Sequence, residues 1–417
     1  MKDPIHSTPG AAPTASDVTG LIHHPYSPPD SFEAPQAGVY KASTVYFPSV
    51  AAMRSREWKD KSAYTYGLHG TPTSYRLEER IATLEGGRYT VLVPSGLSAI
   101  STVGLALLQS GDEILIPDNV YGPSKAFAEG ELARLGVTHQ VYDPMDVEDL
   151  IRRITPRTRL VWLEAPGSVT MEFPDLIEQV RRVREKGPLI ALDNTWGAGL
   201  AFNAFDLRGD GQLGVDLTAH ALTKYPSGGG DVLMGAITSR DRGLHLKIQL
   251  CHMRLGLGVG MNDVEAVLRS LPSMALRYAE HDRTARELAR WWQDQPQCVQ
   301  LLHPAFEGAP GHAHWQALCA SGAHGGQGQA AGLFSVIIDP RYSQAQVDAF
   351  VDGLQRFRIG YSWGGPVSLV VPYDLGSMRQ RWPSTLQQGH VVRFSVGLES
   401  AKALMDDLQA SLQAHLP

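Results

Sequence analysis

Three short segments of the sequence carry residue types that could act together on one small molecule. Ser95-Gly96-Leu97-Ser98 is a turn of small residues, Asp193 ends an apolar run, and Lys224 closely follows another. Each follows an expected strand, so each should lie at the carboxyl edge of a sheet, where α/β folds bind ligands. Small residues at a helix N-terminus let backbone N–H groups approach an anion. A buried aspartate needs a cationic partner or a proton donor.

One cofactor would use all three groups. Pyridoxal phosphate has a phosphate for the turn at Gly96, a ring nitrogen for a buried aspartate, and an aldehyde that forms a Schiff base with a lysine. In this interpretation Asp193 keeps the ring nitrogen protonated, and Lys224 holds the aldehyde and shuttles protons. Singly, Lys224 could be a solvated lysine, Asp193 a helix cap and Gly96 an ordinary turn. Their order along the chain favours the cofactor.

The segments that would position these residues alternate between short apolar runs and helix-length stretches. Continuous apolar runs suit strands buried on both faces, and their alternation with helices predicts βαβ units in a mostly parallel sheet. The runs expected as strands are Thr90–Val93, Glu113–Pro117, Val137–Tyr142, Leu160–Leu163, Leu189–Leu192, Leu217–Ala221 and Val232–Thr238. The helices expected between them are Leu97–Leu108, Pro123–Leu135, Val147–Ile154 and Pro174–Lys186.

The pattern changes after Met261 and predicts a smaller α+β domain. The expected elements are a long helix over Val264–Gln293, a loop over Ala320–Gly332, strands over Leu333–Ile338 and Val391–Val396, and helices over Gln344–Phe357 and Ala401–Leu416. The predicted fold class is therefore α/β, in three parts. Residues 1–60 form a Pro-rich N-terminal arm, residues 61–265 a domain with a mostly parallel seven-stranded sheet, and residues 266–417 a smaller α+β domain.

Composition narrows the class of protein. The 417 residues are 43% hydrophobic, which is typical of a globular protein. They include 37 basic and 43 acidic side chains, and the resulting net charge of −6 gives no electrostatic footprint for nucleic acid. Cys251, Cys298 and Cys319 form no close pair, which argues against a disulfide framework or a cysteine zinc site. The uncharged stretch Tyr89–Gln109 is long enough to span a membrane, but the turn at Pro94–Ser98 indicates a strand and a helix. We expect a cytoplasmic enzyme without a metal, nucleic-acid or membrane partner.

Longer stretches of the chain, from about Tyr40 to the C-terminus, resemble the Cys/Met-metabolism family of fold type I pyridoxal-phosphate enzymes. The matching stretches are Ala42–Val45, Tyr66–Thr71, Leu84–Gly87, Asn119–Ser124, Glu164–Ser168, Asp193–Trp196, Thr223–Tyr225 and Tyr361–Gly365. Within the family the chain is most similar to bacterial cystathionine β-lyases. Pro166–Thr170 and Ser362–Gly365 carry that distinction, because γ-acting members usually have Pro-Thr-Asn-Pro and a Ser-Leu-Gly-Gly type loop there.

The resemblance implies how the cofactor is held. Lys224 resembles the Schiff-base lysine, Asp193 the partner of the ring nitrogen, and Tyr121 the aromatic residue that stacks on the ring near the reacting groups. The implied phosphate ligands are Gly96, Leu97 and Thr223 from one subunit and Tyr66 from its neighbour. Lys224, Tyr121 and Tyr66 are the implied catalytic residues. Tyr121 could instead be a core aromatic.

The resemblance also implies a substrate site and one departure from the family. Arg393 resembles the arginine that binds the substrate α-carboxylate, flanked by Ser362 and Trp363, and its fork suits bidentate carboxylate binding. Alternatively, Arg393 could form a surface ion pair and Trp363 could pack between domains. Relatives commonly carry Tyr-x-Arg, with the arginine on the phosphate across the dimer, whereas Leu68 stands at that position with His69 beside it.

The implied activity is β-elimination of L-cystathionine to homocysteine, pyruvate and ammonia, a carbon–sulfur lyase reaction of methionine biosynthesis. By resemblance the enzyme is a homotetramer of dimers that share active sites. A γ-acting relative, such as a cystathionine γ-lyase, cystathionine γ-synthase or methionine γ-lyase, and a cysteine or cystine desulfhydrase remain open. So does a regulatory protein that keeps the cofactor without turnover. The motifs do not specify the distal half of the substrate, so other thioethers or disulfides also remain open.

Overall fold

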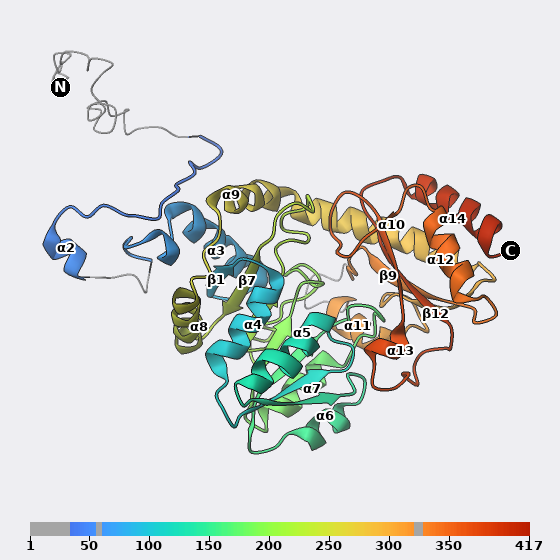
Figure 1. Cartoon of the computed structure of the whole chain (residues 1–417), viewed down its shortest axis with the longest axis horizontal. Helices are drawn as coiled ribbons and strands as arrows, with labels where there is room; N and C mark the ends of the chain where they lie inside the picture. Colours follow the sequence, from blue (N-terminus) through green and yellow to red (C-terminus); the bar gives the residue numbers. More distant parts are fainter. Residues whose placement is uncertain (1–33, 56–60, 321–327) are drawn as a thin grey trace, which may run out of the picture. The chain divides into compact units, whose positions relative to one another are not determined.

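Seven strands form the larger sheet of the computed structural model, which describes residues 34–55, 61–320 and 328–417 (Figure 1). They are β1 (Tyr89–Val93), β2 (Glu113–Pro117), β3 (Thr138–Tyr142), β4 (Thr158–Glu164), β5 (Leu189–Asp193), β6 (Leu217–His220) and β7 (Gly235–Ser239). Their order is β1-β7-β6-β5-β4-β2-β3. Only β7 runs antiparallel to its neighbours within this sheet. The predicted mostly parallel seven-stranded sheet is confirmed.

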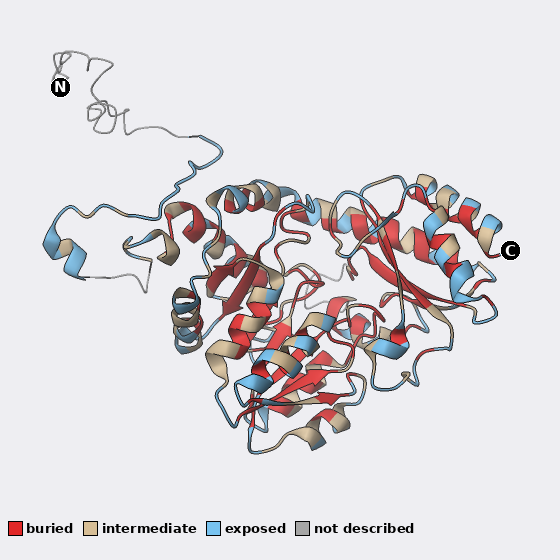
Figure 2. Ribbon diagram, viewed as in Figure 1, coloured by how far each residue is buried: buried red, intermediate tan, exposed pale blue. Residues whose placement is uncertain are grey.

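Helices cover both faces of this sheet because successive strand residues point to opposite sides. The helices are α3 (Pro72–Glu85), α4 (Gly96–Leu107), α5 (Gly122–Phe127), α6 (Val147–Arg153), α7 (Leu176–Arg184) and α8 (Arg242–Leu255). Ile114 and Ile116 pack in the core beneath α4 and α8, whereas Leu115 between them packs in the core with α6 and α7. Figure 2 shows the resulting burial of the strands. Both faces are therefore apolar, as the continuous runs predicted.

A second sheet lies in the C-terminal part of the described chain. It has the order β10-β11-β12-β9-β8, with β8 (Cys298–Leu302), β9 (Leu333–Ile338), β10 (Arg358–Ile359), β11 (Leu369–Tyr373) and β12 (His390–Ser395). Helices α10 (Met274–Gln293), α12 (Gln344–Gly353) and α14 (Ala401–His415) share its core, whereas α9 (Met261–Ser270) packs with α3 and the first sheet. Trp292, Phe334, Phe350 and Phe394 form the centre of its core.

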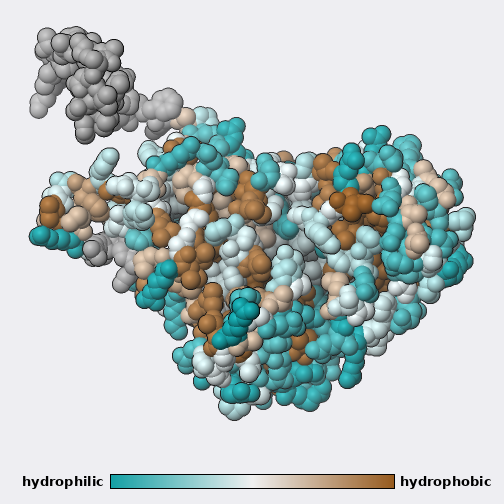
Figure 3. Space-filling model, viewed as in Figure 1, coloured by the Kyte–Doolittle hydropathy of each residue, from teal (hydrophilic) through white to brown (hydrophobic). Residues whose placement is uncertain are grey.

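On the face in Figure 3, hydrophobic groups gather only in small patches among hydrophilic ones.

Several elements differ from the sequence-based expectations. The single helix expected over Val264–Gln293 is divided into α9 and α10 by a 3-10 turn at Leu271–Ser273, because Pro272 lacks an N–H and its ring obstructs a continuous α-helix. The helix expected over Gln344–Phe357 ends at Gly353. The helix expected over Pro123–Leu135 is α5 followed by a π-helical turn at Ala128–Leu132.

Helices α3 and α8 and strands β8, β10 and β11 were not predicted from the sequence. The signals for α3 are present, because Thr71 and Ser74 form a capping box and Pro72 occupies the first turn. Short helices are also found at α2 (Val50–Ser55), α11 (His312–Trp315) and α13 (Leu375–Met378), with a 3-10 turn at Gly67–His69. A π-helical turn follows α11 at Gln316–Ala320.

The chain separates into two units, residues 1–38 and Val39–Pro417, and both sheets belong to the second. The predicted divisions at residues 60 and 265 stay predictions. Residues 1–33 and 56–60 of the predicted arm lie outside the described residues. The stretch Tyr89–Gln109 contains β1 and α4, as predicted. No helix in the described part of the chain is both long and apolar enough to cross a membrane.

A buried ion-pair network ties the segment after α13 to the loop after β2. The Arg379 guanidinium bonds Asp118 Oδ2 at 2.9 Å and Glu172 Oε2 at 2.7 Å, and Lys125 Nζ bonds Asp118 Oδ1 at 2.7 Å. The Arg379 side chain is 5% exposed and that of Glu172 is 1% exposed. Because Tyr121 follows Asp118 closely in the chain, this network holds the base of a loop that carries a predicted site residue.

Candidate active site

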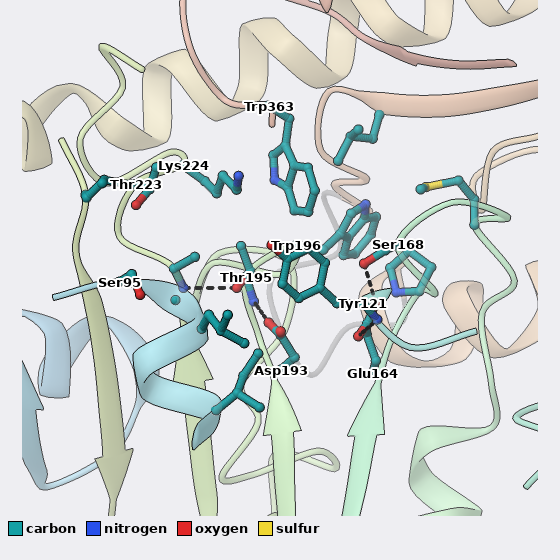
Figure 4. Close-up of a pocket in the computed structure, with 18 residues that line it drawn as sticks. Ser95, Tyr121, Glu164, Ser168, Asp193, Thr195, Trp196, Thr223, Lys224 and Trp363 are labelled. Atoms are coloured by element: carbon teal, nitrogen blue, oxygen red, sulfur yellow. Dashed lines mark hydrogen bonds between the residues drawn. The ribbon is translucent and has the colours of Figure 1, made fainter. Parts of the chain in front are cut away.

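The three segments predicted to act together meet in one cavity of about 170 Å³ at the carboxyl edge of the seven-stranded sheet (Figure 4). The predicted residues that line it are Gly96, Leu97, Tyr121, Asp193, Thr223, Lys224 and Trp363. They come from the loops after β1, β2, β5 and β6 and from the C-terminal part of the chain. Parallel strands bring these loops together because their carboxyl ends share one edge.

The Lys224 amine faces this cavity in an apolar and cationic setting. Its Nζ donates to Ser362 Oγ at 2.6 Å and lies 4.5 Å from the centre of the Trp363 ring. Burial and, next, the positive charge of Arg393 lower the pKa of Lys224 from 10.5 to about 8. A substantial fraction of the amine is therefore neutral near physiological pH, as a nucleophilic lysine requires. Ser362 holds its hydroxyl there with a φ of 113°, a conformation that is costly for a residue with a side chain.

Asp193 and Glu164 are paired in register at the ends of the neighbouring strands β5 and β4. The Thr195 N–H donates to Asp193 Oδ1 at 3.0 Å. Burial raises the pKa of Asp193 and raises that of Glu164 well above its usual range, and Asp193 adds to the effect on Glu164. A cationic ring nitrogen placed beside Asp193 would stabilise the aspartate as an anion. The carboxylate thus fits the predicted partner of pyridoxal phosphate.

The N-terminus of α4 supplies donors for a phosphate. Ser95 caps the helix by accepting from the Ser98 N–H at 3.0 Å, and the Gly96 and Leu97 N–H groups precede the first helical bond, in which the Ala99 N–H donates to the Ser95 carbonyl. A Cβ on Gly96 would lie 2.6 Å from the Ala221 Cβ, so only glycine fits at this position.

Thr223 and Tyr66 are placed less directly for phosphate binding. The Thr223 hydroxyl donates to the Met234 carbonyl and accepts from the Met234 N–H, both at 3.2 Å. Its proton is therefore used within the chain. Tyr66 is 47% exposed and lies beside Leu68 in a shallow hollow lined also by Gly258–Asp263, rather than in the Lys224 cavity. Within one chain, Tyr66 is not brought to the other predicted residues.

Arg393 is a buried cation without a carboxylate partner among the described residues. Only 5% of it is exposed, and its Nη1 donates to the Ser168 carbonyl at 2.9 Å. The guanidinium lies 5.4 Å from the Trp363 ring centre and 5.1 Å from that of Tyr373. Burial lowers the pKa of Arg393. These contacts rule out the surface ion pair considered from the sequence, and they leave a buried positive charge that an anionic ligand would neutralise.

Other residues also line the cavity, and among them Glu164, Ser168, Thr195 and Trp196 were not assigned roles from the sequence. Glu164 could have been found by the reasoning applied to Asp193, because it also follows a continuous apolar strand. Ser168 and Trp196 end two of the stretches that resemble the family, but neither directly follows an apolar strand. The Thr195 hydroxyl accepts from the Ala221 N–H at 3.0 Å and so joins the ends of β5 and β6.

Comparisons with known proteins agree with this geometry. A family model described as Cys/Met metabolism PLP-dependent enzyme matches residues 18–413. The chain belongs to this family. Pyridoxal phosphate is therefore its cofactor, the protein is a PLP-dependent enzyme of Cys/Met metabolism, and the fold type I prediction is confirmed. The anion-binding helix end, the buried aspartate and the lysine in one cavity all fit that cofactor.

Relatives within the family carry different names. The chain is 35% identical to a cystathionine beta-lyase of Bordetella avium, over 96% of this chain and 98% of the relative. It is 32% identical to an L-alanine/L-glutamate racemase of Wolbachia pipientis wMel, over 91% and 92%. A solved cystathionine gamma synthase of Xanthomonas oryzae pv. oryzae, in complex with cystathionine, is 28% identical with a TM-score of 0.78, over 91% and 93%.

Proposed function

We propose that this enzyme catalyses β-elimination of L-cystathionine, giving homocysteine, pyruvate and ammonia. The observation that carries the proposal is the buried Arg393, whose unneutralised guanidinium contacts the same Trp363 ring as the Lys224 amine. An amino-acid substrate held by its α-carboxylate on Arg393 would present its Cα to the lysine. Relatives named cystathionine beta-lyase, matched over nearly the whole chain, support the choice of reaction.

In this proposal the predicted residues of the cavity divide the tasks of the reaction among them. Bound pyridoxal phosphate supplies the electron sink that stabilises negative charge at Cα. Asp193 would hold the ring nitrogen, the α4 N-terminus would hold the phosphate, and Tyr121 would pack against the ring. Lys224, with its pKa of about 8, takes the Cα proton near neutral pH.

The sulfur leaving group needs a proton when the Cβ–S bond breaks. Lys224 can return the proton it has taken from Cα. Tyr121 is the second candidate, because burial and the nearby Asp193 and Glu164 raise its pKa and keep its hydroxyl protonated. The released three-carbon product then reacts with water to give pyruvate and ammonia.

The proposal extends to assembly and location. Tyr66 lies outside the cavity of its own chain and is exposed, which supports contact with the phosphate in a neighbouring subunit. The nearby side chains of Tyr40 and Tyr46 are 58% and 94% exposed. Exposed aromatic rings in this segment support its burial between subunits. We propose a homotetramer of dimers in the cytoplasm.

A second candidate is racemisation of a small amino acid, favoured by the racemase relative and by the Tyr121 hydroxyl, which lines the same cavity as Lys224. Racemisation needs proton transfer on both faces of Cα, and two proton-bearing groups on one cavity could supply it. The γ-acting alternatives are supported by the structure of the Xanthomonas γ-synthase, although a related fold does not specify which bond is broken.

One experiment distinguishes these reactions. The purified holoenzyme is incubated with L-cystathionine, with pyruvate and 2-oxobutyrate measured separately, and with L-alanine, whose chirality is followed. We expect pyruvate, and no product from Lys224→Ala. Predominant 2-oxobutyrate would establish a γ-acting enzyme. Formation of D-alanine without pyruvate would establish a racemase. Arg393→Ala should reduce kcat/KM by about tenfold or more.

A further inference from the structure

Glu164 occupies a central position in the hydrogen bonding of the cavity. It ends β4, and only 6% of the residue is exposed. Its Oε2 accepts from the backbone N–H of Tyr121 at 2.9 Å, and its Oε1 bonds the Ser168 hydroxyl at 2.6 Å. Figure 4 shows both bonds, which converge on one carboxyl group from two different loops.

Ser168, which makes the second of these bonds, also bonds Arg393, the arginine predicted to bind the substrate. The Ser168 carbonyl accepts from Arg393 Nη1 at 2.9 Å, so one residue bonds Glu164 through its side chain and Arg393 through its backbone. Arg393 lies on β12 in the other sheet, and the described segments around it offer it no carboxylate. Glu164 is therefore connected to Tyr121 in one direction and, through Ser168, to Arg393 in the other.

The charge state of Glu164 is compatible with this arrangement. Its register partner on β5 is Asp193, and two buried carboxylates side by side disfavour each other's ionisation. Burial and Asp193 raise the pKa of Glu164 well above its usual range. The Ser168 hydroxyl donates to Oε1 and the Tyr121 N–H donates to Oε2, and a protonated Glu164 still has an acceptor oxygen for each. A glutamine amide can keep both contacts, because its oxygen accepts from Tyr121 and its nitrogen can donate to the Ser168 hydroxyl.

We propose that Glu164 is a positioning residue that holds Tyr121 over the cofactor site and, through Ser168, holds Arg393 for the substrate α-carboxylate. This inference rests on the proposed function only in assigning an α-carboxylate to Arg393. Loss of the Glu164 carboxyl would free both loops at once. The expected effect is weaker amino-acid binding together with slower turnover, without a change of reaction.

The test uses the holoenzyme and four variants: Glu164→Gln, Glu164→Ala, Ser168→Ala and, as control, Glu113→Ala. Glu113 on β2 is another buried carboxylate of the same sheet, and it bonds Thr155 and Thr158 rather than residues of the cavity. Binding of glycine, which has no leaving group, is followed by the visible absorbance of the bound cofactor. The kcat and KM for cystathionine are measured in parallel.

We expect Glu164→Ala to raise the glycine Kd and the cystathionine KM by about tenfold and to lower kcat. Glu164→Gln should restore all of these to within about threefold of wild type, and Glu113→Ala should leave the glycine Kd unchanged. Ser168→Ala should raise the glycine Kd more than it lowers kcat, because the Tyr121 bond remains.

Three results would overturn the inference: an unchanged glycine Kd in Glu164→Ala, a Glu164→Gln variant no better than Glu164→Ala, or an unchanged glycine Kd in Ser168→Ala. If Glu164→Ala does not fold or loses its cofactor, the Gln and Ser168 variants decide. Failure of the wild type to form pyruvate would refute the proposed reaction instead, because glycine binding does not depend on elimination.

Discussion

The lowered pKa of Lys224 predicts how the protein takes up its cofactor. A lysine attacks an aldehyde only as the neutral amine. Burial and the charge of Arg393 lower this pKa from 10.5 to about 8. At pH 7 the neutral fraction rises from about 0.03% to about 9%, roughly 300-fold. The rate of cofactor loading should therefore increase with pH, with a midpoint near pH 8, and level off above about pH 9.

The assay mixes cofactor-free protein with pyridoxal phosphate across this pH range and follows the visible absorbance. Borohydride reduction and peptide mass spectrometry identify Lys224 as the modified residue. Pyridoxal without the phosphate is run in parallel, because the phosphate has its own ionisation near pH 6 and alters binding independently of the amine. Lys224→Ala gives the background.

Substitution of Arg393 separates the two causes of the shift. Arg393→Gln removes the positive charge and should move the midpoint upward, although burial should keep it below 10.5. Arg393→Lys keeps a positive charge and should leave the midpoint close to that of the wild type. A wild-type midpoint near 10.5 would refute the reasoning about burial. Equal midpoints in the Gln and Lys variants would refute the contribution of Arg393.

Three other substitutions test different parts of the structure. Gly96→Val should lower the cofactor content and the thermal midpoint, because its Cβ would lie 2.6 Å from a neighbouring side chain. Gly130→Ala is the control. It should lower neither quantity, because a Cβ at Gly130 meets nothing within 4 Å. Arg379→Ala should reduce the free energy of unfolding by about 3–5 kcal/mol in urea titrations, because it leaves the buried Glu172 without its cationic partner and leaves Asp118 paired with Lys125 alone. The half-exposed Arg283→Ala should cost less than about 1 kcal/mol. Equal losses from the two arginine variants would contradict that account. Leu68→Arg should slow cofactor loss during dialysis against a competing carbonyl reagent, because the added guanidinium would reach the phosphate in the neighbouring subunit. An unchanged rate of loss would show that the existing phosphate ligands suffice.

The sequence by itself determined the elements of the larger sheet and the order of the cofactor residues along them. Continuous apolar runs identify strands buried on both faces, and a polar residue directly after such a run must lie at a strand end. Asp193, Lys224 and the turn at Gly96 could be placed in this way because each lies next to the pattern that reveals it. Local signals also mark the break at Pro272 and the start of α3.

The tertiary structure alone decided which residues from distant segments touch each other. Ser362 bonds Lys224 across 138 positions of sequence, and Arg393 bonds Ser168 across 225. Neither contact is encoded in a local pattern, because it depends on how the two sheets pack together. The same holds for Glu164. Its place at a strand end was readable from the sequence, but its bonds to Tyr121 and Ser168 arise only where loops from two strands converge.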